Sequence, residues 1–398
     1  MRNGDWMLRA RARRTIGRLS RPVGLVVCGL LGAGLVAHAS ADIVVPRDFS
    51  TIQAAVDAAP AGATIKIQRG TYTEQLVIAK NVILRGAGAG QTVIKAPATI
   101  DTYAVDVFGP APVGAIVRIT DGANVSLSGV TVTGPTPCFA VSGVVVVKGA
   151  TLDLHESQVT LIRPDDPGCP ITFRSSGVVI GLPFFVVIDG ETDGGSIGHG
   201  TVTQVAVDKY LTTGIAVLGP FAGPPSTATL KENVITGGNP FTAPGQGGIT
   251  VSFAAVAQVT ENTIRGTVCT DATICGRDPI NQFQSVGIGL NSIPAGTVIE
   301  ENRLSSNDVG IYLFGSDGCC RTRKNTVTDS RFFGIVVQDG VAETSENKIS
   351  GGEVGIGVVA DFVDTVAVSR DDQIKQTSVA PVQEIECCGF TATAIRTP

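Results

Sequence analysis

The sequence predicts an all-β protein folded as a right-handed parallel β-helix, a solenoid with a short N-terminal capping helix. Two recurring patterns and one helix signal predict this fold. A Gly-Ile dipeptide opens a short alternating stretch six times, and Asn precedes an aliphatic residue at matching intervals. Such a repeat buries its apolar face only when neighbouring copies stack, so we expect successive coils to share one core.

The Gly-Ile dipeptides mark the first predicted strand of each coil. Val or Leu follows each glycine after three residues, with a mostly small residue between, which is the alternation of a strand with one buried face. The isoleucines should form one interior column, and the intervening residues should face outward. The column comprises Ile215, Ile249, Ile288, Ile311, Ile335 and Ile356, and the outward residues are Ala216, Thr250, Gly289, Tyr312, Val336 and Gly357.

Asparagine marks the second predicted strand, and an aliphatic residue follows each asparagine after two positions. Asparagine at a fixed corner suits the left-handed αL backbone, and stacked amides can hydrogen-bond from coil to coil. We therefore assign these asparagines a structural role. They are Asn233, Asn262, Asn302, Asn325 and Asn347, with Asp372 in a decayed sixth copy, and the aliphatic column is Ile235, Ile264, Leu304, Val327, Ile349 and Ile374.

The spacing of the repeats predicts where loops interrupt the solenoid. The best-defined coils recur every 21 to 24 residues. Longer intervals predict inserted loops at 220–226, 239–246 and 267–284.

A capping helix is predicted near the start of the mature chain. Ser50 and Gln53 have capping-box spacing, residues 52–56 carry an apolar stripe, and Pro60 ends the helix. A helix at this place would cover the open end of the first coil. Solenoids need such a cap because an exposed core end pairs with other molecules.

Residues 1–41 have the pattern of a secretory signal peptide. Seven arginines precede the uncharged stretch 23–36, and Ala39-Ser40-Ala41 offers a cleavage site. We expect cleavage after Ala41, a periplasmic or secreted location, and a single domain over 42–398. The apolar stretch is too short for a stable spanning helix and no second one follows, so we expect no membrane span.

Removal of the leader makes the chain strongly acidic. The leader holds seven of the 30 basic residues and one of the 35 acidic residues, so the mature net charge is −11. This charge argues against nucleic acid and against an anionic membrane surface as partners. We expect the mature protein to be a monomer.

Eight cysteines follow the leader, and an even count in an exported chain predicts disulfides. The third and fourth are spaced to close the loop at 267–284, and the first two flank one coil. The two vicinal pairs either join each other or close on themselves. Zinc is the alternative, but the chain has no C-x-x-C pattern. The cysteines are Cys138, Cys169, Cys269, Cys275, Cys319, Cys320, Cys387 and Cys388.

Residues 42–94 contain TIQAAVDAAP, ATIKIQRG and NVILRGAGAGQTVI, and Gly70–Glu74 match a G-x-Y-x-E motif. This segment resembles the opening of pectinesterases, in the pectin-lyase-like superfamily. The resemblance implies a β-helix related to carbohydrate, with Tyr72 and Glu74 in structural roles. An enzyme of this kind would be a polysaccharide lyase or a carbohydrate esterase. The catalytic motifs of pectinesterases and pectate lyases are not found, so no catalytic residue is carried over.

Two sets of carboxylates are candidate metal or catalytic sites. Asp189, Glu191 and Asp193 have the shape of a calcium loop without the closing Glu of an EF-hand, and a solvated turn is the alternative. Ca²⁺ is the ion that this set would hold; the fold itself requires no cofactor.

The second set consists of Asp317, Asp339 and Asp361, which lie 22 residues apart, close to the coil period. Stacking would bring them about 5 Å apart. At that distance the like charges would raise one another's pKa unless a cation joined them, as in a metal site or a general acid/base pair. Three unrelated turn residues are the alternative.

Candidate substrate-binding residues lie near these aspartates in the sequence. Four cations could meet an acidic sugar there, and a solvated loop is the alternative. The candidates are Tyr312, Arg321, Arg323, Lys324 and Arg331.

The sequence leaves two functions open. The resemblance implies an exported protein that binds or processes an acidic polysaccharide or a cell-surface glycan. The alternative is a non-catalytic surface or structural solenoid. The outward face of the Gly-Ile strands distinguishes the two, because a charged cleft there would favour catalysis, and the sequence places no acid or base on it.

Overall fold

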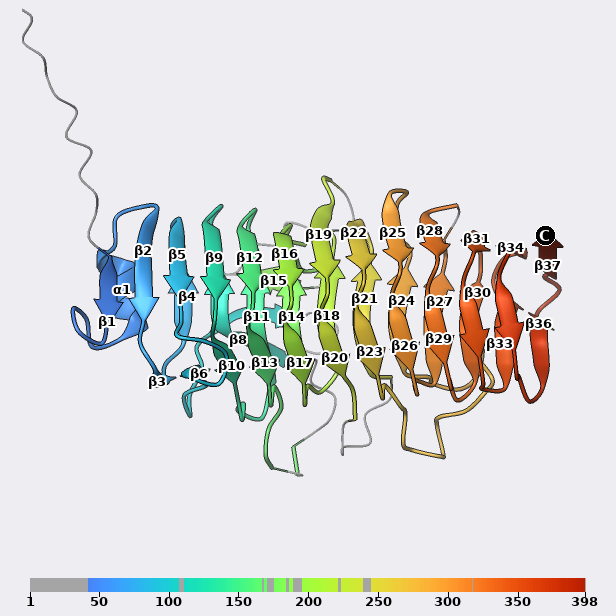
Figure 1. Cartoon of the computed structure of the whole chain (residues 1–398), viewed down its shortest axis with the longest axis horizontal. Coiled ribbons are helices and arrows are strands. Elements are labelled where there is room, and N and C mark those ends of the chain that lie inside the picture. The colour runs from blue at the N-terminus through green and yellow to red at the C-terminus, as the bar shows by residue number, and fades with distance from the viewer. Residues whose placement is uncertain are drawn as a thin grey trace, which may run out of the picture. The chain divides into compact units, whose positions relative to one another are not determined.

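Short strands stack into three sheets around one continuous core (Figure 1). The computed structural model describes residues 42–106, 111–166, 168–169, 175–183, 186–188, 195–220, 223–238, 245–316 and 318–397. Over these residues the chain passes repeatedly from sheet A to sheet B to sheet C, and each full coil adds one strand to each sheet. This is the parallel β-helix that the repeats predict.

The three sheets are defined by their strands. Sheet A contains β1 (Ile43–Val45), β2 (Ala63–Ile67), β5 (Val82–Arg85), β9 (Asn124–Ser128), β12 (Thr151–His155), β16 (His199–Thr203), β19 (Ser226–Lys231), β22 (Ala255–Thr260), β25 (Thr297–Glu300), β28 (Cys320–Arg323), β31 (Val341–Ser345), β34 (Thr365–Arg370) and β37 (Ala392–Thr397). Sheet B contains β3 (Gly70–Thr73), β6 (Thr92–Lys95), β10 (Thr131–Thr133), β13 (Gln158–Thr160), β17 (Ala206–Asp208), β20 (Val234–Thr236), β23 (Thr263–Arg265), β26 (Arg303–Ser305), β29 (Thr326–Thr328), β32 (Lys348–Ser350) and β35 (Gln373–Lys375). Sheet C contains β4 (Leu76–Ile78), β7 (Thr102–Asp106), β8 (Ala111–Ile119), β11 (Ala140–Val146), β14 (Ser176–Ile180), β15 (Val186–Ile188), β18 (Thr213–Leu218), β21 (Gly247–Ser252), β24 (Val286–Asn291), β27 (Val309–Phe314), β30 (Phe333–Gln338), β33 (Val354–Ala360) and β36 (Ala380–Glu386).

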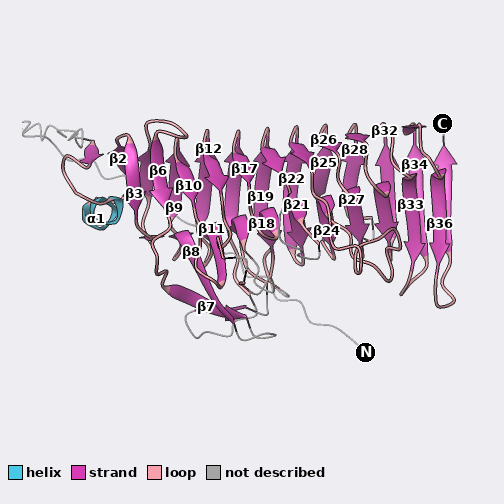
Figure 2. Ribbon diagram, turned by 90° about the horizontal axis from the view of Figure 1, so that it is seen from below, coloured by secondary structure: helices cyan, strands magenta, loops and turns pink. Residues whose placement is uncertain are grey.

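Two strands of sheet C depart from the parallel pattern. Strand β7 pairs with β8 and with β15, and both pairings are antiparallel. In Figure 2, β7 lies below the neighbouring strands of sheet C. This excursion covers part of the outward face of that sheet.

The predicted isoleucine column lies in the core. Adjacent strands of sheet C place each Gly-Ile isoleucine beside the next, from Ile215 on β18 to Ile356 on β33. All six side chains have an exposed fraction of 0–1%. Burial of an aliphatic side chain of this size stabilises a fold by roughly 1.5–3 kcal/mol, so the column contributes substantially to stability. The second column, on sheet B, is confirmed as well, with Ile374 only partly buried.

The asparagines form a continuous hydrogen-bonded ladder between sheets A and B. The side-chain Nδ2 of each asparagine donates to Oδ1 of the next at 2.9–3.0 Å, and Asp372 accepts the last of these bonds. All five asparagines are fully buried. The expected coil-to-coil bonding is therefore present in the structure.

The αL corner lies one residue earlier than expected. The residue before each ladder asparagine has a positive φ, for example 57° at Glu261 and 60° at Glu301. The asparagine side chain must point inward to join the ladder, so the left-handed turn falls on the preceding residue, whose charged side chain remains in solvent. The prediction that asparagine itself occupies αL was wrong.

Helix α1 (Ile52–Ala58) covers the first coil, as predicted. Its N-cap is Thr51, whose hydroxyl accepts a hydrogen bond from Ala54 N at 3.1 Å, so the expected cap at Ser50 is displaced by one residue. Glu74 completes the cap, because its two carboxylate oxygens accept from the backbone N–H groups of residues 52 and 53 at 2.9 Å each. The glutamate of the G-x-Y-x-E motif is thus a structural residue that holds the helix on the solenoid.

The last described coil carries charges at positions that are aliphatic in earlier coils. Glu384 continues the interior column of Val358, and Glu386 continues that of Ala360. Their carboxylates accept from backbone N–H groups of β37 at 2.8 and 3.2 Å. Charged groups therefore follow the apolar columns in the last described coil.

All eight cysteines that were predicted to form disulfides are paired in the structure. The first two pairs follow the expected spacing, and each vicinal pair closes on itself. The disulfides are Cys138–Cys169, Cys269–Cys275, Cys319–Cys320 and Cys387–Cys388. The predicted leader lies outside the described residues, and within them no helix is long and apolar enough to cross a membrane.

Candidate functional site

A groove with a volume of about 370 Å³ lies on the outward face of sheet C, over β18, β21, β24 and β27. Strand register forms its floor from neighbouring outward positions on consecutive coils. One column of the floor contains Thr250, Gly289 and Tyr312, and the next contains Ser252, Asn291 and Phe314. The floor is therefore built by the same alternation that buries the isoleucines on the other face.

The walls of the groove come from the segments that precede two of these strands. Gln246 precedes β21 and Gln284 precedes β24. Gln284 Nε2 donates to the carbonyl of Gly276 at 3.1 Å, whereas its Oε1 has no hydrogen-bond partner among the described residues. Gln246 is nearly buried and donates to the carbonyl of Tyr210 at 3.2 Å. Both amide groups are turned into the protein, so these two glutamines shape the rim through their buried contacts.

Gly289 leaves the middle of the floor open. A Cβ atom at this position would meet only Val286 Cγ1, at 3.7 Å, which is ordinary van der Waals contact. At Gly247 a Cβ atom would approach Thr250 Oγ1 to 2.7 Å. A side chain can therefore be added at Gly289, and not at Gly247, without a clash.

Tyr312 supplies an aromatic ring and a protonated hydroxyl to the groove. The hydroxyl donates to Gln338 Oε1, and Gln338 Nε2 in turn donates to Asp339 Oδ2 at 3.3 Å. Burial, followed by the negative charges of Asp339 and Asp361, raises the pKa of the Tyr312 phenol well above its usual value. The phenol therefore stays protonated at neutral pH and acts as a hydrogen-bond donor, not as a base.

The described lining of the groove carries no charged side chain. It presents hydroxyl and amide groups beside the rings of Tyr312 and Phe314 and the bare backbone of glycines. Such a surface can hydrogen-bond hydroxyl groups and stack against an apolar ring face. It offers no group that would remove a proton at neutral pH.

Part of the outward face of sheet C lies beneath strands β7 and β15, which we call the first cover. Tyr103 and Ala104 of β7 and Ile188 of β15 pack against outward residues of the early coils, including Val145 and Ala216. All five are buried. The first cover thus ends beside the groove.

Residues 267–285 form a second cover over the later coils. Ile280 packs on an outward apolar cluster that contains Val309, Phe333 and Val336. Arg277 lies farther along, where its Nη2 donates to the side chain of Gln383 on β36 at 2.9 Å. This cover therefore extends from the edge of the groove to the last coil.

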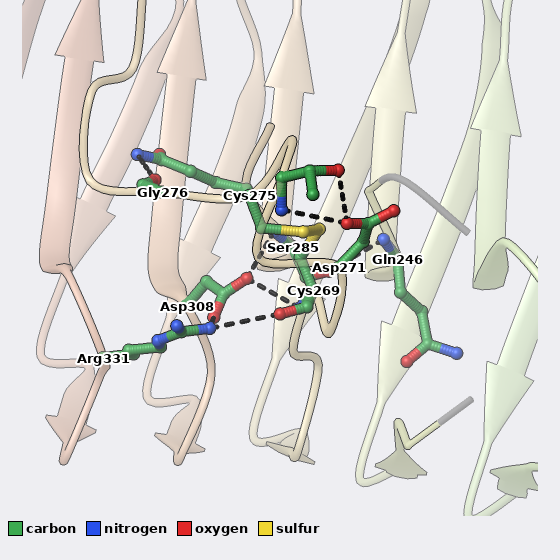
Figure 3. Close-up of a disulfide and its surroundings, with 10 residues drawn as sticks. Gln246, Cys269, Asp271, Cys275, Gly276, Ser285, Asp308 and Arg331 are labelled. Atoms are coloured by element: carbon green, nitrogen blue, oxygen red, sulfur yellow. Dashed lines mark hydrogen bonds and ion pairs between the residues drawn. A yellow bond between two sulfur atoms is a disulfide. The ribbon is translucent and has the colours of Figure 1, made fainter. Parts of the chain in front are cut away.

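Asp308 holds both ends of the second cover (Figure 3). Its Oδ2 accepts from Cys269 N at 2.7 Å and from Ser285 N at 3.0 Å. Arg331 Nη1 lies 3.7 Å from Asp308 Oδ1 and donates to the carbonyl of Cys269 at 3.1 Å. Burial raises the pKa of the Asp308 carboxyl, and the two backbone bonds and Arg331 oppose that effect. We call this arrangement the Asp308 clasp.

Two of the three candidate aspartates, Asp339 and Asp361, are in direct contact. Asp339 Oδ1 accepts from the backbone N–H groups of Asp361 and Phe362 at 2.8 and 2.9 Å, which shapes the turn after β33. The Asp361 carboxylate lies within 4.8 Å of the sulfurs of one vicinal pair, which are bonded to each other. Asp317 lies outside the described residues.

The four candidate cations do not share the site of Tyr312. Arg321 and Arg323 lie on β28 in sheet A, and Lys324 occupies the αL corner after it. Arg323 pairs with Glu300 at 2.7 Å, and Arg331 belongs to the Asp308 clasp. One turn of the solenoid thus distributes these neighbours in sequence over different sheets and turns. The calcium candidates Asp189, Glu191 and Asp193 lie outside the described residues.

The sequence predicted the outward column that contains Thr250, Gly289 and Tyr312. It did not predict the second column of the floor or the two glutamines at the rim. Asn291 and Phe314 lie four residues after the glycine of their Gly-Ile dipeptides, so extending the alternation by one step would have found them. Gln246 and Gln284 precede the repeat and have no periodic signal.

Comparison with known proteins supports the fold. A family model described as "Right handed beta helix region" matches residues 198–362, which include most of the coils with Gly-Ile and Asn signals. Together with the three parallel sheets, this match confirms the predicted right-handed parallel β-helix. A search of curated proteins finds no match.

Three solved structures are similar to the chain at low identity. An alginate lyase from Paenibacillus sp. str. FPU-7 is 14% identical with a TM-score of 0.41, over 85% of this chain and 96% of that one. The A-module of the Azotobacter vinelandii mannuronan C-5 epimerase AlgE4 is 15% identical with a TM-score of 0.41, over 87% and 95%. PfbA, a surface adhesin of Streptococcus pneumoniae, is 12% identical with a TM-score of 0.47, over 86% and 93%.

Proposed function

We propose that this protein is an exported carbohydrate-binding protein that holds a neutral glycan segment in the groove on sheet C. The observation that carries this proposal is the lining itself, which combines uncharged hydroxyl and amide groups with two aromatic rings. Sugars present hydroxyl groups at their edges and C–H groups on their faces, so both kinds of contact find a partner in such a groove.

The charge of the groove favours a neutral ligand over the acidic polysaccharide expected from the resemblance. Arginine and lysine are the side chains that recognise carboxylates, and neither occurs in the described lining. Asp339 and Asp361 lie close enough to Tyr312 to raise the pKa of its phenol, so the local field is negative. A carboxylate on the ligand would therefore be repelled.

The groove also favours binding over catalysis. Cleavage or epimerisation of a polysaccharide requires a group that exchanges a proton with the substrate. Tyr312 remains protonated, and the other described lining residues do not titrate near neutral pH. We therefore propose a binding role, in line with the non-catalytic function that the sequence leaves open.

Export is part of the proposal. The arginine-rich leader and its Ala-Ser-Ala site support it, and so do four disulfides, which persist in oxidising compartments. Mass spectrometry of protein collected outside the cytoplasm should show a mature chain that begins at Asp42. A full-length cytoplasmic product would contradict this part.

Gly289→Leu tests the groove. The leucine side chain would fill the floor without a backbone clash, so we expect loss of glycan binding by about tenfold or more, roughly 1.4 kcal/mol, with an unchanged melting temperature. The measurement is calorimetry with neutral oligosaccharides selected on a glycan array, compared with polyuronates.

Thr229→Leu is the matched control, since Thr229 is exposed on the outward face of sheet A. It should bind like the wild type. Equal binding by Gly289→Leu and the wild type, or tighter binding of polyuronates than of neutral sugars, would contradict the proposal.

A further inference from the structure

We infer that the groove accepts a short oligosaccharide or the end of a glycan chain, and excludes a long chain running along the solenoid. This inference rests on the proposed carbohydrate binding and specifies the class of ligand. It is carried by one outward column of sheet C, which is buried at both ends and open only in its middle.

The column can be followed residue by residue through the strand register. It contains, in order, Val145, Val179, Ala216, Thr250, Gly289, Tyr312 and Val336. The first three have exposed fractions of 0%, 5% and 4%, and the last has 0%. Only the middle three are accessible, and all of them line the groove.

The first cover closes the side of the earlier coils. Ile188 and Ala104 pack over the outward residues down to Ala216, and Leu218 and Phe253 border the same apolar cluster. Strand β15 pairs with β7, and β7 in turn pairs with β8, through backbone hydrogen bonds. This barrier is part of the sheet and stays in place.

The second cover closes the side of the later coils and is fixed at three points. The Asp308 clasp holds both of its ends, and the Cys269–Cys275 disulfide closes a loop within it. Arg277 fastens its far part through Gln383 and through an ion pair with Glu353 at 3.5 Å. These contacts make the second cover a fixed wall of the groove.

The open part of the column is short compared with a polysaccharide chain. The three accessible positions lie on strands spaced about 4.8 Å apart, so they span about 10 Å between the covered residues. The volume of about 370 Å³ is at the lower end of the range for small-ligand sites, with room for about two or three sugar units. A chain aligned with the axis of the solenoid would meet a protein wall at each end.

Affinity as a function of chain length tests this inference. The probes are cello-oligosaccharides and manno-oligosaccharides of two to six units and soluble mannan, measured by calorimetry on the full mature chain. We expect affinity to rise up to two or three units and then to stay within about twofold. A tenfold gain from three to six units would overturn the inference.

Cysteine labelling tests the closed ends without any sugar. The eight native cysteines are in disulfides, so one added thiol can be followed with a small thiol reagent under non-reducing conditions. Gly289→Cys should react at least tenfold faster than Val145→Cys and Val336→Cys, whose positions are buried under the covers.

The outcomes separate the two proposals. If either covered position reacts as fast as Gly289→Cys, the ends are open, and the inference fails even when sugars bind. If none of the sugars binds although only Gly289→Cys reacts, the carbohydrate proposal fails, and the ligand class inferred here falls with it.

Discussion

Asn302 shows how much of this fold depends on single buried amides. Its Oδ1 accepts from the backbone and the side chain of Asn262, and its Nδ2 donates to Val259 O and Asn325 Oδ1, at 2.8–3.0 Å. Every hydrogen-bonding site of the side chain is therefore satisfied inside the solenoid, where an unmade bond is costly.

Asn302→Ala should lower the free energy of unfolding by roughly 2–4 kcal/mol, because it leaves buried groups on two neighbouring coils without partners. Urea titration followed by circular dichroism measures this change. Arg303→Ala, at the next residue and exposed on sheet B, should change the free energy by about 0.5 kcal/mol or less. Equal effects of the two variants would contradict the role of the ladder.

Several residue roles were predictable and others were not. The ladder was predictable because Asn recurs at a fixed distance from an aliphatic residue, and only a stacked fold gives that spacing a use. The role of Glu74 was not predictable, because its partners on α1 lie more than twenty residues away. The αL residue was misplaced by one because glutamate in that conformation has no distinctive signal.

The second cover is the element that turns a flat sheet face into a groove. It was predicted as a loop from the long interval between two repeats, but its path over the later coils depends on contacts with Gln383 and Glu353, which are far away in sequence. The same holds for the first cover, whose strands come from two separate excursions of the chain. A repeat pattern describes the coils and carries no information about segments that leave them.

The Asp308 clasp should make stability depend on pH. Because burial raises the pKa of this carboxyl in the folded protein, the stability contributed by neutral Asp308 is present below the unfolded pKa of about 3.9 and is lost as pH rises through the folded pKa. The free energy of unfolding of the wild type, relative to Asp308→Asn, should therefore decrease as pH rises above about 4 and then level off.

Urea titrations of the wild type and of Asp308→Asn, each between pH 4 and 8, measure this difference in the free energy of unfolding. The contributions of the other titrating groups cancel, because both proteins contain them. An increase of the difference with pH would show that the backbone bonds and Arg331 outweigh burial.

Helix α1 should depend on Glu74. Glu74→Gln removes the charge beside the helix N-terminus and one of two accepting oxygens, so we expect a loss of about 1–2 kcal/mol. Hydrogen exchange should show faster exchange at the amides of Ile52 and Gln53. Asp57→Asn is the control, because this carboxylate accepts only from the exposed side chain of Gln53 among the described contacts. Unchanged exchange in Glu74→Gln would exclude the capping role.

At the scale of the whole molecule, a solenoid must prevent its ends from stacking. Helix α1 covers the first coil, and Glu384 and Glu386 continue two core columns in the last described coil. Inward charges of this kind make it unfavourable for the edge of another β-sheet to dock. The period of the repeats predicted the stack of coils, and the capping-box spacing predicted the helix at its start. The two glutamates belong to no recognisable repeat, and their role was not predicted.

The double substitution Glu384→Val with Glu386→Val should promote association of the protein end to end. It extends two aliphatic columns by one coil, so we expect larger species than the wild type forms at the same concentration. Light scattering after size-exclusion chromatography detects the change. Glu343→Val, on the exposed face of sheet A, should keep the size of the wild type. A double variant of unchanged size would show that these charges do not oppose association.

The amide ladder gives the solenoid an electrical polarity. Within the ladder, the bond between neighbouring side chains always runs from Nδ2 of one asparagine to Oδ1 on the later coil, so the side-chain dipoles point the same way from Asn233 to Asn347. Aligned dipoles reinforce one another, and the positive end of such a row favours a negative charge. Asp372 stands at that end, where its carboxylate accepts from Asn347, Thr344 and Ser369. In the sequence, Asp372 replaces the asparagine of the repeat. In the structure, its carboxylate is the acceptor at the positive end of the aligned amide dipoles.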